Sequence, residues 1–116
     1  TQNQNQSHKM KLLLSLLLGL LSASLCPVAF SADIDAGATV SQGCVMCHGQ
    51  NGISHLPGIP SLAGQPEPYL ASQIKQFRDG KRHHEQMNVI AKPLSDTDIE
   101  NVAAWFAQFE IELKKP

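Results

Sequence analysis

Cys44-Val45-Met46-Cys47-His48 is the stretch that decides how this chain of 116 residues is interpreted. Two cysteines separated by two residues and followed directly by histidine form the motif that attaches haem covalently. The two thiols can form thioethers with the two vinyl groups of one haem, and the adjacent imidazole then lies beneath the iron as an axial ligand. The motif therefore predicts one haem, held by Cys44 and Cys47, with His48 as a ligand of the iron.

Two other uses of a C-x-x-C pair are known, and the remaining sequence disfavours both. A zinc site needs further ligands at suitable spacing, but the one other cysteine, Cys26, lies in an apparent leader. A thioredoxin-like redox pair belongs at a strand-to-helix junction, and no strand-rich pattern surrounds Cys44 and Cys47. Haem attachment is therefore the favoured interpretation.

Residues 1–31 have the layout of upstream residues followed by a secretory signal peptide. Lysines flank Met10, leucines fill most of residues 12–21, and small residues follow. The apolar run is shorter than the about 20 residues that a membrane span requires. We expect cleavage after Ser31, which puts Ala29 and Ser31 at the small-residue positions. The mature protein is then periplasmic and not stably inserted in the membrane.

Residues 32–116 provide enough chain for one small domain. With Cys44 and Cys47 bonded to haem, no disulfide can strengthen it, so the haem itself is expected to supply the apolar surface that the helices cover. Two alternatives would anchor the domain to the membrane: a leader that is not cleaved, or a lipid attached to Cys26. Both are disfavoured. No basic stripe or aromatic platform accompanies the net charge of −1, which argues against nucleic acid as a partner.

The pattern of the domain predicts helices joined by loops, and no strand. Asp35 is the expected N-cap of a helix that leads into the cysteine motif. A second helix begins near Glu67 or Pro68 and ends at Gly80, because apolar residues recur on one face at helical spacing between them. The last helix begins after Ser95, with Asp98 as the acid of a capping box.

Two segments of the domain carry no predicted helix. Residues 49–68 are rich in Gly and Pro, and a loop of this length in a compact domain is usually functional. Residues 81–93 are polar and are expected to connect the second and last helices.

Five short motifs follow one another along the chain. They are Cys44-Val45-Met46-Cys47-His48-Gly49, Pro60-Ser61-Leu62-Ala63-Gly64-Gln65, Phe77-Arg78-Asp79-Gly80-Lys81-Arg82, Met87, and Leu94-Ser95-Asp96-Thr97-Asp98-Ile99. In this order they resemble a class I cytochrome c of the small bacterial periplasmic branch, whose domain also occurs doubled in dihaem proteins. The resemblance implies an all-α fold, with about three to four short helices and long loops wrapped around one covalently bound haem c.

The resemblance also implies roles for individual residues. His48 is then the proximal iron ligand, and the carbonyl of Pro60 accepts a hydrogen bond from its ring N–H. Leu62 packs against the porphyrin, and Met87 is the distal iron ligand. The other methionines are less suitable, because Met10 belongs to the leader and Met46 lies between the two thiols.

The expected function is electron transfer by a monohaem carrier whose iron cycles between Fe(II) and Fe(III). With both axial positions filled, no substrate reaches the iron, so the protein is not expected to be an enzyme. It is expected to be a monomer that meets redox partner proteins transiently.

Two alternatives stay open. If Met87 does not bind, the iron is open or is bound by His83 or His84, and the protein acts as a small peroxidase or gas sensor. The domain is otherwise a haem-carrying subunit of a larger oxidoreductase.

We predict that the domain needs haem in order to fold. Without it, Cys44→Ala/Cys47→Ala should give an unfolded or molten chain, because a core of this size is marginal on its own. Near-ultraviolet circular dichroism of the variant, compared with that of the haem-loaded parent, measures fixed tertiary packing. A near-native tertiary signal from the variant would contradict the prediction.

Overall fold

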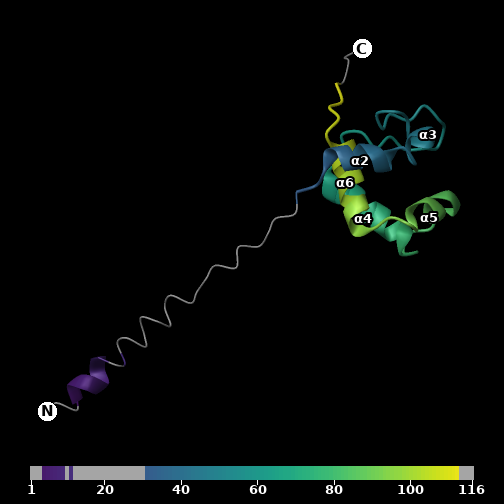
Figure 1. Ribbon diagram of the computed structural model, residues 1–116. Helices are drawn as coiled ribbons and strands as arrows, with labels where there is room; N and C mark the ends of the chain where they lie inside the picture. Colours follow the sequence, from purple (N-terminus) through teal and green to yellow (C-terminus); the bar gives the residue numbers. More distant parts are fainter. Residues whose placement is uncertain (1–3, 10, 12–30, 113–116) are drawn as a thin grey trace. The chain divides into compact units, whose positions relative to one another are not determined.

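The computed structural model describes residues 4–9, 11 and 31–112, and it divides the chain into two compact units, Thr1–Phe30 and Ser31–Pro116 (Figure 1). Residues 4–9 and 11 of the first unit are helical. The predicted apolar core of the signal peptide, residues 12–21, lies outside the described residues. No helix in the described part of the chain is long and apolar enough to cross a membrane.

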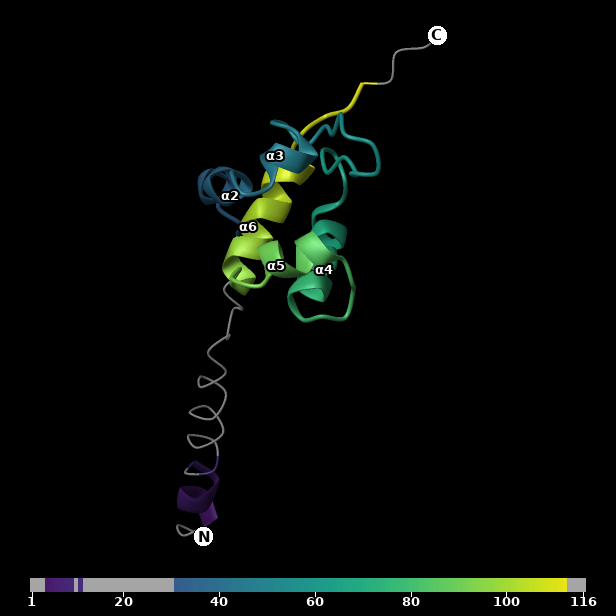
Figure 2. The same ribbon diagram turned by 90° about the vertical axis from the view of Figure 1, so that its right-hand side faces the viewer.

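Helices and loops make up the second unit, and residues 31–112 contain no strand. In chain order the helices are α2 (Ile34–Ser41), α3 (Val45–His48), α4 (Glu67–Arg78), α5 (Glu85–Ala91) and α6 (Asp96–Ala107). The predicted all-α fold is confirmed. Helix α6 is central, since both α2 and α4 pack against it, and α5 packs against α4 (Figures 1 and 2).

The contact between α4 and α6 forms the buried core. Leu70 of α4 meets three residues of α6, namely Val102, Ala103 and Phe106, and all four are almost completely buried. Helix α6 begins as the sequence predicts: the Ser95 hydroxyl accepts from the backbone N–H of Asp98, whose carboxylate accepts from the Ser95 N–H. This reciprocal pair satisfies backbone donors that the helix cannot satisfy itself.

Helix α2 begins two residues earlier than the sequence suggests. The N-cap is Asp33, not Asp35, because the Asp33 carboxylate accepts a hydrogen bond from the N–H of Ala36 at 3.0 Å. The backbone N–H of Asp33 in turn donates to Asn101 Oδ1 of α6 at 2.9 Å. The start of α2 is therefore fixed by a partner 68 residues away, which local sequence cannot reveal.

The polar segment that follows α4 contains a helix that the sequence analysis missed. Helix α5 is seven residues long, and its N-cap is His84, whose Nδ1 accepts from the N–H of Met87 at 3.4 Å. Histidine is not one of the preferred N-cap residues, so the usual start signal was absent. An apolar signal was present, because Met87, Ile90 and Ala91 recur at helical spacing, but polar residues precede and separate them.

The Gly- and Pro-rich loop between α3 and α4 is ordered by backbone contacts with itself and with α6. The carbonyl of Gly52 accepts from the N–H groups of Leu62 and Ala63, and the N–H of Gly64 donates to the carbonyl of Phe106. Gly52 has φ +74°, and a Cβ there would collide with the Phe106 ring and the Ala63 nitrogen. The loop consequently lies close against α6, and it carries Pro60 to the cysteine motif.

We predict that Gly37→Ala destabilises the haem-loaded protein although alanine is the better helix former. Gly37 lies where α2 touches α6, and an added Cβ would collide with the Asn101 carbonyl. Overpacking of this kind typically costs about 1–3 kcal/mol. Chemical denaturation of the parent and the variant measures the difference in the free energy of unfolding.

Gly43→Ala provides the matched control for that experiment. The nearest atom to a Cβ at Gly43 is the Val40 carbonyl oxygen at 3.7 Å, which is an ordinary contact. Equal stabilities of Gly37→Ala and Gly43→Ala would mean that the α2–α6 contact tolerates a methyl group.

Candidate haem site

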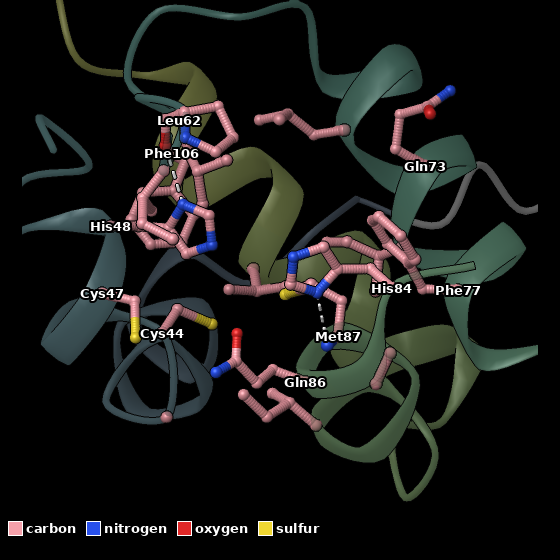
Figure 3. A pocket seen from close by; sticks show the side chains of 18 of the residues that line it. Cys44, Cys47, His48, Leu62, Gln73, Phe77, His84, Gln86, Met87 and Phe106 are labelled. Carbon is pink, nitrogen blue, oxygen red and sulfur yellow. Dashed lines mark hydrogen bonds between the residues drawn. The ribbon is translucent and has the colours of Figure 1, made fainter. Parts of the chain in front are cut away.

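A cavity of about 280 Å³ opens between α3 on one side and α4 and α5 on the other. Its walls are mostly apolar, and the large apolar side chains among them include Leu62, Leu70, Ile74, Phe77, Val102 and Phe106. Figure 3 shows the two cysteines and His48 on one side of this cavity, and Met87, Gln86 and His84 on the other. The cavity therefore brings together residues that lie about forty positions apart in the sequence.

His48 is buried, and one of its two ring nitrogens is already engaged. Nδ1 lies 2.8 Å from the carbonyl oxygen of Pro60. A carbonyl can only accept, so Nδ1 carries the proton and donates it. Nε2 is then left with a free lone pair, which is the form of imidazole that binds a metal. The distance is that of the hydrogen bond that the resemblance implies.

The two thiols lie beside His48 because α3 is a single helical turn. Cys44 is the N-cap of α3, and its carbonyl accepts from the N–H of His48 at 3.0 Å. Three positions separate Cys44 from Cys47, so the helical turn puts them on one face. Burial, with a smaller contribution from the nearby Cys47, raises the pKa of the Cys44 thiol. Cys44 is half-buried and Cys47 is exposed, and no disulfide joins them.

Met87 extends from α5 toward the cavity and is half-buried there (Figure 3). Met46, by contrast, is 89% exposed and does not line the cavity. This difference agrees with the preference for Met87 over Met46 as the candidate distal ligand.

The two histidines that precede α5 differ in position. His84 lines the cavity, and its ring meets the Phe77 ring edge to face at 6.4 Å between centroids. His83 is exposed, as His84 is, but it is not among the residues that line the cavity. Of the two rival ligands considered from the sequence, His84 alone is near the site.

The cavity is poor in charge. Arg82 is the one lysine, arginine, aspartate or glutamate among its lining residues. Its guanidinium lies 4.5 Å from the centre of the Phe77 ring, and its Nη1 donates to Gln73 Oε1. These contacts fix the one cation at the edge of an otherwise apolar site.

All six predicted site residues line this cavity: Cys44, Cys47, His48, Pro60, Leu62 and Met87. Their roles toward a cofactor stay predictions. The sequence analysis gave no role to Gln73 or Gln86, which also line the cavity, or to Asn88, whose side chain ties α5 to α4. An isolated amide side chain has no recognisable spacing, so the sequence offered no signal for any of the three.

The chemistry of these residues fits a haem group. Two thiols, one imidazole nitrogen and one thioether are the donors that attach and axially bind such a group, and here all four face one largely apolar cavity. In the described part of the chain, no cluster of three or more His, Cys, Asp or Glu side chains could hold a metal ion.

Comparison with known proteins gives the same result. Residues 34–110 match the family model described as cytochrome c. The chain is 43% identical over 97 residues to cytochrome c4 of Pseudomonas aeruginosa, covering 84% of this chain and 47% of that protein. It is 40% identical over 83 residues to a thiosulfate dehydrogenase electron acceptor of Thiomonas intermedia, covering 71% and 38%.

A solved structure is similar as well. The reduced recombinant cytochrome c4 from Pseudomonas stutzeri superposes with a TM-score of 0.65 at 35% identity, covering 69% of this chain and 47% of that one. The chain thus spans about half the length, or less, of each of these three proteins. The chain belongs to the cytochrome c family, and covalently bound haem c is its cofactor.

Proposed function

We propose that this protein is an electron carrier in which His48 and Met87 bind the iron from opposite sides. The observation that carries the proposal is that these two side chains face one cavity from α3 and α5 (Figure 3). Haem supplies a one-electron couple, Fe(II) and Fe(III). With both axial ligands in place the iron has no position for a substrate, so we propose no enzymatic activity.

The protein's own residues hold and orient this couple. Cys44 and Cys47 would attach the haem, and the Pro60 carbonyl holds the ring of His48 so that Nε2 would be available to bind the iron. Such a hydrogen bond to a ligand's second nitrogen also makes the ligand more basic. Leu62 and the other apolar side chains exclude water, and a low dielectric together with a thioether ligand raises the reduction potential.

The proposal also covers the compartment of the protein and the class of its partners. Residues 32–116 form the cytochrome domain, and residues 1–31 are upstream sequence and a signal peptide cleaved after Ser31, which directs the domain to the periplasm. The partners are redox proteins that bind transiently to a monomer. One relative is named as the electron acceptor of an enzyme, thiosulfate dehydrogenase, which supports a redox enzyme as the class of partner.

A second candidate function follows from the position of His84. Its ring lines the cavity, and Nδ1 accepts from the Met87 N–H, so the proton of the neutral ring is on Nε2. If His84 replaced Met87 on the iron, or if the position stayed open, the protein would suit a peroxidase or gas sensor. Binding of iron by His84 would require Nε2 to lose this proton or Nδ1 to give up the cap at the start of α5, which favours Met87.

Met87→Ala tests the electron-carrier proposal. The ferric parent should have the far-red methionine–iron charge-transfer band, and the variant should lose it completely. The ferrous variant should also bind carbon monoxide far more tightly than the parent, in which the gas must displace Met87, because the sixth position is then open. Visible absorption spectra of the oxidised and reduced haem-loaded proteins provide both readings.

Met46→Ala is the matched control, since it removes a thioether that is almost fully exposed. Its spectra should equal those of the parent. A parent without the far-red band, or a band that survives in Met87→Ala, would exclude Met87 as the ligand. Carbon monoxide binding by the parent as tight as that of Met87→Ala would favour the sensor or peroxidase.

A further inference from the structure

One side chain next to Met87 makes an unusual number of contacts outside its own helix. Asn88 Nδ2 donates to the carbonyl of Phe77 at 2.6 Å and to the carbonyl of Arg82 at 2.8 Å. Asn88 Oδ1 accepts from the backbone N–H of His84 at 2.7 Å. A single amide therefore joins the last turn of α4, the connecting turn and the N-cap of α5.

The three partners determine which residue can occupy this position. Two of them are carbonyls, which need donors, and the third is an N–H, which needs an acceptor. The side-chain amide of asparagine offers both, and its length matches the gap. An aspartate of the same size would keep the acceptor for His84 but would face the carbonyls of Phe77 and Arg82 with no proton to donate.

Helix α5 depends on such anchors. It is seven residues long, and helices this short are unstable in isolation. Among the helix pairs with substantial contact, α5 packs against α4, while α6 is held by both α2 and α4. The position of Met87 relative to His48 is consequently set by what fixes α5 to α4.

His84 connects the anchor to the ligand. Its N–H donates to Asn88 Oδ1, its carbonyl accepts from the backbone N–H of Asn88 at 2.9 Å, and its Nδ1 accepts from the N–H of Met87. Because Asn88 fixes the backbone of His84, it also fixes the hydrogen bond that His84 Nδ1 accepts from the Met87 N–H. The chain of contacts runs from α4 through Asn88 and His84 to the residue that faces the cavity.

We propose that Asn88 is a positioning residue that holds Met87 in place as the distal ligand. Asn88 does not line the cavity and touches no reacting atom. Its contribution is to favour the state in which Met87 binds the iron over states in which the sixth position is empty or holds another ligand. This inference rests on the proposed function, since it requires Met87 to be the ligand.

Carbon monoxide binding to the haem-loaded ferrous protein measures this contribution. The gas must displace Met87, so its apparent affinity rises in proportion to the fraction of protein in which Met87 is released. We expect Asn88→Ala to raise that affinity at least about tenfold, because three hydrogen bonds are lost. The far-red band of the ferric protein should weaken in parallel, while the covalent haem content stays at the level of the parent.

Asn88→Asp separates the contribution of the two donated hydrogen bonds from that of the accepted one. It keeps the size of the side chain and the acceptor for His84, but it loses both donors. We expect an effect as large as that of Asn88→Ala. Should Asn88→Ala fail to accumulate, Asn88→Asp gives the same comparison.

Asn101→Ala is the control for general loosening of the fold. Asn101 is also a buried amide that joins two elements, through the Asp33 N–H, but it does not line the cavity. It should lower the stability of the protein and leave the far-red band and the carbon monoxide affinity unchanged.

Two results would overturn the inference. One is a parent-like band and affinity in both Asn88 variants. The other is an equal rise in affinity in Asn101→Ala and Asn88→Ala, which would mean that any loosening releases Met87. Neither result touches the proposed function, whereas a far-red band that survives in Met87→Ala would remove the ligand and this inference with it.

Discussion

The hydrogen bond from His48 Nδ1 to the Pro60 carbonyl is the contact on which the site depends. It joins the cysteine motif to the long loop between α3 and α4. Pro60 lies outside any helix, so no regular secondary structure connects it to His48. The bond selects the imidazole tautomer and turns Nε2 toward the cavity. The backbone of the loop, which carries Pro60, is bonded to itself at the Gly52 carbonyl and to α6 through the Gly64 N–H. The central helix thus positions the first ligand without contributing a ligand itself.

The two walls of the cavity are built in different ways. On the first wall, Cys44, Cys47 and His48 lie within five consecutive residues, so a single turn of helix sets their relative positions. On the second wall, Met87 has no such neighbours and depends on how α5 is attached to α4. Covalent attachment would make the first wall permanent, whereas a bond from the Met87 thioether to iron, as proposed, would be reversible.

Much of this arrangement is predictable from local sequence, and the two exceptions have different causes. The motif with Cys44 and Cys47, the span of α4 and the capping box at Ser95 depend on residues within a few positions of one another, and the sequence predicts all three. The start of α2 depends on Asn101, which is distant in the sequence, so local reasoning chose Asp35 and was wrong. A tertiary hydrogen bond of this kind leaves no spacing to recognise. Helix α5 was missed although Met87, Ile90 and Ala91 recur at helical spacing, because the polar residues around them led to the segment being interpreted as a connection.

The position of the core explains why haem binding is expected to contribute to the folding of this domain. The buried core between α4 and α6 is small, and several of its members, including Leu70, Val102 and Phe106, also line the cavity. These side chains therefore have one face against protein and one face toward the cofactor. A group that fills the cavity adds apolar contact to both helices at once, and it links α3 to α5, which are not among the helix pairs with substantial contact. Binding free energy that connects separate elements acts as folding free energy, as it does in other small domains organised by a metal or cofactor. The proposed ligand pair would for this reason be both the redox site and the last structural connection of the fold.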